Sequence, residues 1–232
     1  MNNFIRINDI DCDFTNFIIT TKNVDSKSRE DMKKVCDEAG LNFDNLTSNI
    51  QTHSDMVNVI YKENISKKVE SDALITNLEN VPLLVFTADC VPIGIIDKSK
   101  KVIGVVHAGW KGTYNEIVKN TIHKMIEVYG CNTDDLICVI GPSIGKCCYE
   151  VSNELAIKFE ERFGEGFYNL KDEKYYLDLW KINEYIIKST KVSNIINLNL
   201  CTSCNSKLFH SYRKDNKTDK RIGMIIQINK GE

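Results

Sequence analysis

Four short runs of almost uninterrupted apolar residues constrain the fold of this chain more than any other feature. They read VPLLVF (81–86), VPIGIID (91–97), KVIGVV (101–106) and LICVIGP (136–142). A strand with one face in water alternates apolar and polar residues, whereas a strand covered on both faces is continuously apolar. The runs therefore predict buried strands at the centre of a layered fold.

Further strands and helices complete the predicted architecture. Strand character is found in three more segments, 55–62, 195–200 and 221–228. Helical spacing of apolar residues is found in four segments, 28–41, 113–129, 151–164 and 177–190. Because the 232 residues contain no repeat or linker, we predict one α/β or α+β domain over residues 1–232, with mixed β-sheets flanked by helices.

The predicted helices carry their own boundary signals. The helix from about Thr113 to Tyr129 has an apolar stripe and is followed by Gly130; the stripe consists of Ile117, Ile122, Met125 and Ile126. Ser152 and Asp178 are suitable N-caps for the two later helices.

Composition excludes several classes of partner. The net charge is −2, so no basic surface is expected for nucleic acid or an acidic membrane. No apolar stretch is long enough to span a bilayer, and the N-terminus does not have the apolar centre of a signal peptide. We therefore expect no membrane association and a cytoplasmic location. Nine cysteines in such a compartment favour thiols, metal ligands or catalysis over disulfides.

Two of the buried runs have ligand-type residues at their ends. Cys90 precedes VPIGIID and His107 follows KVIGVV, while His53 stands just before another strand-like segment. One thiolate and two imidazoles make a three-ligand site with an open position, as in catalytic zinc sites, or, less specifically, a copper site. The alternative is that Cys90 is a buried thiol and both histidines are merely hydrogen-bonded.

Longer motifs resemble a known family. TADCVPIGIID, VIGVVHAGWKGT and IGPSIGKCCYEV are similar to the YfiH-type laccase-domain family, also called polyphenol oxidase or multicopper oxidase-like. QTHSD, SDALIT, CTSC and LFHSYRKD stand in the family's order, so the resemblance runs from about Gln51 to the C-terminus. It implies that the metal ligands are His53, Cys90 and His107. It also implies a fold similar to the catalytic domain of cytotoxic necrotizing factor.

The resemblance implies a zinc-dependent purine nucleoside phosphorylase that also has adenosine deaminase activity. Its substrates would be phosphate and adenosine, inosine, guanosine or methylthioadenosine. We predict that Lys111, Gly112 and Arg213 bind phosphate, since phosphate needs cations or helix N-terminal amides. Asp89 is either an orienting or proton-transferring group beside Cys90, or a turn residue that caps local amides.

The remaining cysteines are interpreted by context. Cys147 and Cys148 lie in a family motif, and either one thiol, taken as Cys148, reaches the substrate pocket or both pack at a tight turn. Cys201 and Cys204 form a CxxC without a second such pair, so no separate structural zinc is expected there.

The chain departs from the family pattern in several places. The first long helix has SREDMKKV where a Glu-Asn-Arg motif is usual, and Lys111 replaces an arginine. His210 stands where the family has an aromatic residue, and TDKR replaces a Thr-Gly-Arg sequence. Because lysine has no bidentate fork, the exchange at Lys111 predicts altered substrate contacts.

Other functions remain as alternatives. A metal-free cysteine hydrolase or deamidase would use Cys90 as nucleophile and His107 as base, and would not need His53. A copper-dependent polyphenol oxidase needs more histidines than the four in this chain. A non-enzymatic partner-binding module would leave the three ligands unexplained. The preferred nucleoside and the oligomeric state are not predicted.

Overall fold

The strands form two large sheets and one small one. A computed structural model describes residues 2–8, 10 and 12–231. The five-stranded sheet has the order β1 (Phe4–Arg6), β2 (Thr15–Thr20), β14 (Ile222–Ile228), β6 (Leu83–Thr87) and β3 (Thr47–Ser48). The six-stranded sheet has the order β13 (Asn194–Asn197), β9 (Leu136–Ile140), β7 (Val91–Asp97), β8 (Val102–Ala108), β5 (Ala73–Thr76) and β4 (Val57–Val59). The small antiparallel sheet has the order β10 (Glu150–Val151), β12 (Lys174–Leu177) and β11 (Tyr168–Lys171).

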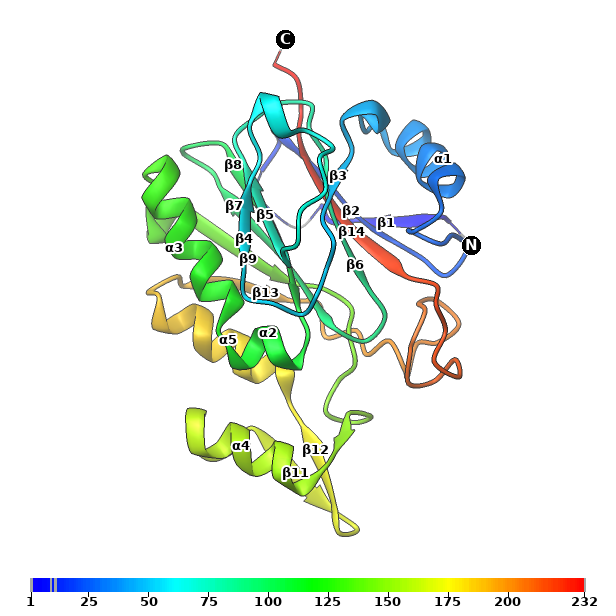
Figure 1. The fold of residues 1–232 in the computed structure, drawn as a ribbon, viewed down its shortest axis with the longest axis vertical. Coiled ribbons are helices and arrows are strands. Elements are labelled where there is room, and N and C mark those ends of the chain that lie inside the picture. The colour runs from blue at the N-terminus through cyan, green and yellow to red at the C-terminus, as the bar shows by residue number, and fades with distance from the viewer. Residues whose placement is uncertain (1, 9, 11, 232) are drawn as a thin grey trace.

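Among the described residues, five α-helices lie around the sheets. They are α1 (Arg29–Ala39), α2 (Trp110–Tyr114), α3 (Ile117–Tyr129), α4 (Asn153–Phe163) and α5 (Leu179–Ser189). Short 3-10 turns occur at Phe43–Asn45, Lys62–Asn64 and Thr133–Asp135. Figure 1 shows α1 on one side of the sheets, α3 and α5 on the other, and α4 beside the small sheet at one end. In the part of the chain that is described, no helix is long and apolar enough to cross a membrane.

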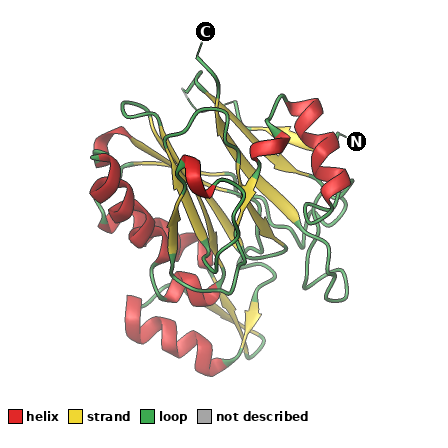
Figure 2. Cartoon of the chain, turned by 45° about the horizontal axis from the view of Figure 1, so that its top comes forward, coloured by secondary structure: helices red, strands yellow, loops and turns green. Residues whose placement is uncertain are grey.

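The two large sheets pack face to face. One apolar cluster joins residues of β2, β6 and β14 to residues of β7, β8 and β9. At Gly94 in β7 the sheets come so close that a Cβ would lie 2.7 Å from Cζ of Phe17. The strands of both large sheets are among the yellow arrows in Figure 2, which also shows the strands of the small sheet.

Each large sheet is covered on its outer face by helices. A second apolar cluster joins the outer face of the six-stranded sheet to α3, α4 and α5, and a third joins the five-stranded sheet to α1. The strands β7 and β8 contribute to the clusters on both faces, and all their residues are buried. The prediction of strands covered on both sides is therefore confirmed, as is a mixed α+β architecture.

Most predicted helix boundaries are confirmed. Gly130 ends α3 in the left-handed conformation, which glycine adopts without a steric penalty, and Gly40 ends α1, predicted over residues 28–41, in the same way. The side chains of Ser152 and Asp178 accept hydrogen bonds from the first-turn amides of α4 and α5.

The prediction of a single helix from Thr113 to Tyr129 is wrong. The segment is broken at Asn115 and Glu116, and Glu116 has a φ of 58°. The Glu116 carboxylate contacts Lys119 and Arg162, which hold this residue at the start of α3. Apolar periodicity could not reveal the break because Glu116 is not a residue that usually adopts this conformation. Ile126, expected in the apolar stripe, is 37% exposed.

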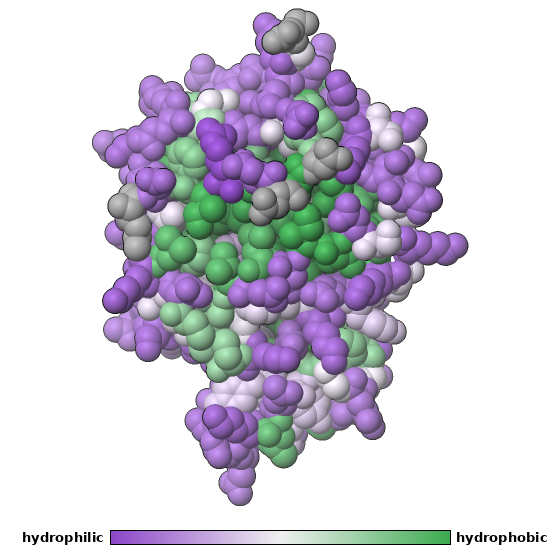
Figure 3. Space-filling model, turned by 180° about the vertical axis from the view of Figure 1, so that it is seen from behind, coloured by the Kyte–Doolittle hydropathy of each residue, from purple (hydrophilic) through white to green (hydrophobic). Residues whose placement is uncertain are grey.

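Seen from behind, apolar residues gather across the middle of the molecule and hydrophilic residues surround them (Figure 3).

Candidate metal centre and pocket

The sheet register brings Cys90 and His107 to one edge. Strand β7 begins at Val91, directly after Cys90, and pairs antiparallel with β8, which ends just after His107. Pro92 is the register partner of His107, and Cys90 lies two residues before Pro92, just outside this end of the ladder. His53 comes from the loop between β3 and β4 and completes the group.

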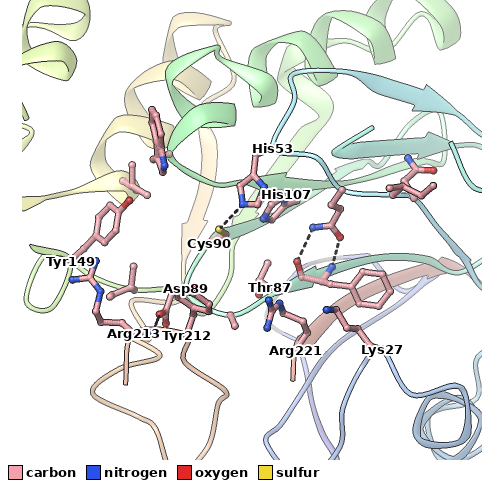
Figure 4. A pocket seen from close by; sticks show the side chains of 18 of the residues that line it. Lys27, His53, Thr87, Asp89, Cys90, His107, Tyr149, Tyr212, Arg213 and Arg221 are labelled. Atoms are coloured by element: carbon pink, nitrogen blue, oxygen red, sulfur yellow. Dashed lines mark hydrogen bonds between the residues drawn. The ribbon is translucent and has the colours of Figure 1, made fainter. Parts of the chain in front are cut away.

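We call His53, Cys90 and His107 the ligand triad. Their candidate ligand atoms all lie within 4.8 Å of one another. The Cys90 Sγ is 3.8 Å from the His53 Nε2, and the two imidazole rings meet edge to face with their centroids 4.8 Å apart. His107 is buried, Cys90 is half-buried and His53 is exposed, so the group opens toward solvent on one side (Figure 4).

A residue that the sequence analysis missed, Asp72, supports the triad from behind. Its fully buried carboxylate accepts a hydrogen bond from His107 Nδ1 at 2.7 Å and from the backbone amide of His53 at 3.1 Å. It also accepts bonds from the backbone and hydroxyl of Ser54, each at 2.7 Å. Asp72 is the second residue of the SDALIT motif and directly precedes β5, where an acidic residue resembles an ordinary turn residue.

Asp72 fixes how His107 presents its ring. Because Nδ1 is bound to the carboxylate, Nε2 is the ring nitrogen left to face a ligand. A carboxylate behind a histidine is the arrangement that orients metal ligands and raises their basicity. Burial alone would raise the pKa of Asp72, but the hydrogen bonds from His107 and Ser54 outweigh it and lower the pKa to about 2.

The electrostatics of the triad favour a thiolate. Burial alone would raise the pKa of Cys90, but the charge and hydrogen bonding of His107 and His53 outweigh it and lower the pKa to about 6. Burial would lower the pKa of His107, but Cys90 and Asp72 raise it. The thiolate is the form that binds metal and acts as a nucleophile.

The backbone around the triad is held in uncommon conformations. His53 and Asp89 have φ values of 60° and 84°, which non-glycine residues rarely adopt and which tend to occur at functional sites. Gly109 packs directly against the triad, since a Cβ there would lie 2.8 Å from His53 Cδ2 and 3.1 Å from Cys90 Sγ. Glycine is therefore required for close approach at this point.

The triad fits a metal ion by its chemistry. One thiolate and two imidazoles form a suitable donor set for zinc, with room for a fourth ligand on the open side. The Asp72 carboxylate bound to His107 provides the outer support that such sites have. The same three residues are those that the sequence analysis proposes as ligands.

The triad lies on the wall of a cavity of about 840 Å³. Figure 4 shows Tyr149 and Arg213 to one side of the triad and Lys27 and Arg221 to the other. The cavity is also lined by Trp110, and it is large enough for a ligand of nucleoside size.

Asp89 and Arg213, both predicted site residues, line this cavity. The Asp89 carboxylate accepts hydrogen bonds from the Arg213 backbone amide and the Thr202 hydroxyl, each at 2.6 Å. The Arg213 guanidinium donates to the Glu150 carbonyl at 3.0 Å and lies over the Tyr149 ring. Asp89 thus fixes the loop that carries Arg213.

Three other predicted site residues lie outside the cavity lining. Lys111 and Gly112 belong to the short helix α2, where Lys111 extends over the Trp110 ring. The Cys148 Sγ lies 3.5 Å from Cys204 instead of entering the cavity. The sequence analysis did not select Lys27 and Arg221, because isolated surface-type cations carry no distinguishing pattern.

Comparisons with known proteins agree with this description. The model of the family described as multi-copper polyphenol oxidoreductase laccase matches residues 10–229. A purine nucleoside phosphorylase of Clostridium acetobutylicum is 44% identical over 182 residues, which are 76% of this chain and 74% of that protein. A protein of an unknown prokaryotic organism, named adenosine deaminase RL5, is 31% identical over 195 residues, covering 76% and 72%.

A solved structure shows the same fold. The crystal structure of the Bacillus licheniformis hypothetical protein YfiH superposes with a TM-score of 0.87 at 27% identity, covering 93% of each chain.

Proposed function

Since this chain belongs to the multi-copper polyphenol oxidoreductase laccase family, we propose that it is a zinc-dependent purine nucleoside phosphorylase with adenosine deaminase activity. Relatives that carry these two names support the reaction class. The proposed substrates are phosphate and adenosine, inosine, guanosine or methylthioadenosine.

One observation carries the proposal: the ligand atoms of the triad converge within 4.8 Å on the wall of a nucleoside-sized cavity. When bound, a zinc ion would supply a Lewis acid for the negative charge that develops on the departing purine and would acidify water for deamination. In the absence of metal the triad favours the Cys90 thiolate, so its electrostatics already suit a cation.

The side chains around the triad have complementary roles in this proposal. Trp110 and Tyr149 offer ring faces on which a purine can stack. Burial, with a further contribution from Cys90, raises the pKa of Tyr149, so its phenol stays protonated and can donate to the nucleoside. In this proposal the Arg213 guanidinium, which lines the cavity, binds phosphate oxygens, since the bidentate fork of arginine suits them.

Lys27 and Arg221 give the cavity a second cationic side. They lie across the triad from Arg213. We therefore assign the phosphate to the side of Arg213, and the ribose or a substituent to the side of Lys27 and Arg221. Asp89 acts as a positioning residue that holds the Arg213 backbone, and Asp72 holds His107 and His53.

The alternatives fit less well. A cysteine hydrolase built on Cys90 and His107, by analogy with the toxin fold, gives no role to His53, which lies 3.8 Å from the thiol. A copper oxidase would need a histidine-rich centre, and among the described residues the site has two histidines.

We test the proposal with His53→Ala and with His123→Ala as the matched control, since His123 is an exposed residue of α3. We expect His53→Ala to lose the zinc of the triad and about 1,000-fold in kcat/KM for nucleoside cleavage, a loss of about 4 kcal/mol in transition-state stabilisation. His123→Ala should keep both. Full activity of His53→Ala combined with an inactive Cys90→Ala would support the hydrolase instead.

The reaction class is tested by its products. Purified protein is incubated with each nucleoside in the presence and absence of phosphate, and the products are separated by chromatography. Phosphate-dependent release of the base with ribose-1-phosphate indicates phosphorolysis, and inosine formed from adenosine indicates deamination. Release of base without phosphate would contradict a phosphorylase.

A further inference from the structure

Two pairs of cysteines that are far apart in the sequence meet near the surface, where two of the four side chains are exposed. They are Cys147, Cys148, Cys201 and Cys204, which we call the four-cysteine cluster. Their sulfur atoms all lie within 4.8 Å of one another. The Cys204 Sγ is 3.5 Å from the Sγ of Cys147 and 3.5 Å from that of Cys148.

The backbone holds the two halves of the cluster together. Ser143 and Cys201 form a parallel bridge, with the Ser143 amide bonded to the Leu200 carbonyl at 3.1 Å and the Thr202 amide bonded to the Ser143 carbonyl at 3.0 Å. The Gly145 amide donates to the Cys201 sulfur at 3.3 Å. The meeting of the sulfurs therefore follows from main-chain pairing and does not depend on side-chain orientation alone.

The separations match one metal ion. A zinc ion with four thiolates at about 2.3 Å has its sulfurs about 3.8 Å apart, at the corners of a tetrahedron. The sulfurs here span 3.5 Å to at most 4.8 Å. An iron–sulfur cluster binds its cysteines through several irons and needs them farther apart.

We propose that the four-cysteine cluster is a structural zinc site, separate from the ligand triad. Four thiolates close the coordination sphere and leave no position for substrate, which is the pattern of structural rather than catalytic zinc. The sequence predicts no structural zinc because the chain has no second CxxC, and here the adjacent pair Cys147–Cys148 takes the place of that second pair. Zinc binding here is independent of the reaction proposed above.

The cluster joins the two segments that build one side of the cavity. The first segment continues from Cys148 into Tyr149, and the second continues from Cys204 to Arg213. The Ile144 amide is bonded to the Asp89 carbonyl at 2.9 Å, which ties the same region to the residue before Cys90. A metal ion in the cluster therefore fixes the wall that carries Tyr149 and Arg213.

Metal counting tests this inference. Protein purified under reducing conditions and saturated with zinc is freed of excess metal and measured by inductively coupled plasma mass spectrometry. We expect about two zinc ions per chain for the wild type and for Cys131→Ser, the control at a cysteine outside both groups. Cys147→Ser and Cys204→Ser should each keep about one, and both positions are exposed, so the substitutions need not disturb the core.

The two sites can be told apart. His53→Ala should also keep about one zinc ion, and Cys204→Ser combined with His53→Ala should keep none. If Cys204→Ser loses metal while nucleoside cleavage is absent even from the wild type, the structural site stands and the proposed function fails. About one zinc ion in the wild type, unchanged in Cys204→Ser, would overturn the inference.

Cobalt provides a measurement that does not depend on the folding of a cluster variant. Co²⁺ is added to metal-free Cys90→Ser protein, in which the triad has no thiolate. We expect thiolate-to-cobalt charge-transfer absorption and the visible bands of tetrahedral cobalt. Absence of these bands, or a disulfide between Cys204 and Cys147 or Cys148 found by peptide mapping of protein kept under reductant, would overturn the inference.

Discussion

The ligand triad and the four-cysteine cluster both gather soft ligands, but they draw them from different kinds of segment. The triad takes Cys90 and His107 from the ends of buried antiparallel strands, and a buried carboxylate, Asp72, stands behind it. The cluster takes its four sulfurs from two surface segments, and Cys147 and Cys204 are exposed. The triad faces a cavity of about 840 Å³, whereas the cluster lies outside its lining.

This difference suits the triad to a catalytic role and the four-cysteine cluster to a structural one. Rigid strand ends hold three ligands at a fixed spacing and leave a fourth position open, which a reaction requires. Loops are less ordered by themselves, and a metal ion bound by four of their side chains stabilises them. The comparison predicts that changes at the triad affect catalysis, whereas changes at the cluster affect the order of the cavity wall.

The largest effect should come from Gly109→Ala. The backbone of Gly109, with φ of −66°, accepts any residue, so the effect is purely steric: the new Cβ would lie 2.8 Å from His53 Cδ2. We expect the His53 ring to be displaced, with loss of the triad's zinc and of activity, while zinc in the four-cysteine cluster remains. Metal analysis and nucleoside assays check this.

Gly130→Ala is the control for Gly109→Ala. Gly130 has φ of 65° and no atom within 4 Å of its Cβ position, so the substitution should cost about 1 kcal/mol of stability from backbone strain. Both zinc ions should remain. Loss of cluster zinc in Gly109→Ala would show that the two sites are not independent.

A smaller effect is expected for Asp72→Asn. Removing the carboxylate behind His107 should weaken zinc binding at the triad by about 10- to 100-fold and leave the cluster unchanged. Competition with a chromophoric chelator measures both affinities. Asp97→Asn, at another fully buried aspartate, is the matched control and should lower stability without changing either affinity. Equal zinc affinity of Asp72→Asn and wild type would contradict a role of Asp72 in supporting the metal ligands.

The same carboxylate predicts a pH dependence of stability. Because the folded-state pKa of Asp72 is lowered from 3.8 to about 2, its contribution of about 2 kcal/mol is complete above pH 4 and is lost as the pH falls through 2. Urea unfolding of metal-free protein should show that the free energy of unfolding falls more steeply between pH 5 and 3 for wild type than for Asp72→Asn.

The sequence predicts the frame because strands buried on both faces must be continuously apolar. Cys90 and His107 stand out at the ends of such runs, but this pattern leaves open whether they bind metal, and the family resemblance is needed to select them together with His53. Asp72 could not be predicted in the same way, since its role comes from hydrogen bonds to His107 and a distant loop. Its chemistry alone resembles that of a turn residue.

The four-cysteine cluster could not be predicted because its halves are distant along the chain. Cys147 and Cys204 are 57 positions apart, and the bridge between Ser143 and Cys201 that joins their segments is formed by main-chain atoms without a sequence signature. The break before α3 could not be predicted for a related reason: Glu116 contacts Arg162 of another helix, α4, which is distant along the chain.

The smallest of the expected effects concerns the charge state of Cys90. Burial would raise its pKa, but His107 and His53 lower it from 9.0 to about 6, so metal-free protein should carry the Cys90 thiolate at neutral pH. Its rate of alkylation by iodoacetamide should rise through a midpoint near pH 6, as measured by mass spectrometry of the modified peptide. Cys36, whose pKa burial raises to about 11, serves as an unreactive control.

Zinc should abolish the alkylation of Cys90 by occupying its lone pairs. Asp72→Asn should move the midpoint upward, because the carboxylate helps to keep His107 charged beside the thiolate. In the described part of the chain no histidine belongs to the four-cysteine cluster, so its thiols have no such partner. A Cys90 midpoint above pH 8 would mean that the imidazolium does not act on it, and the contrast between the two groups of ligands would then lie in their geometry alone.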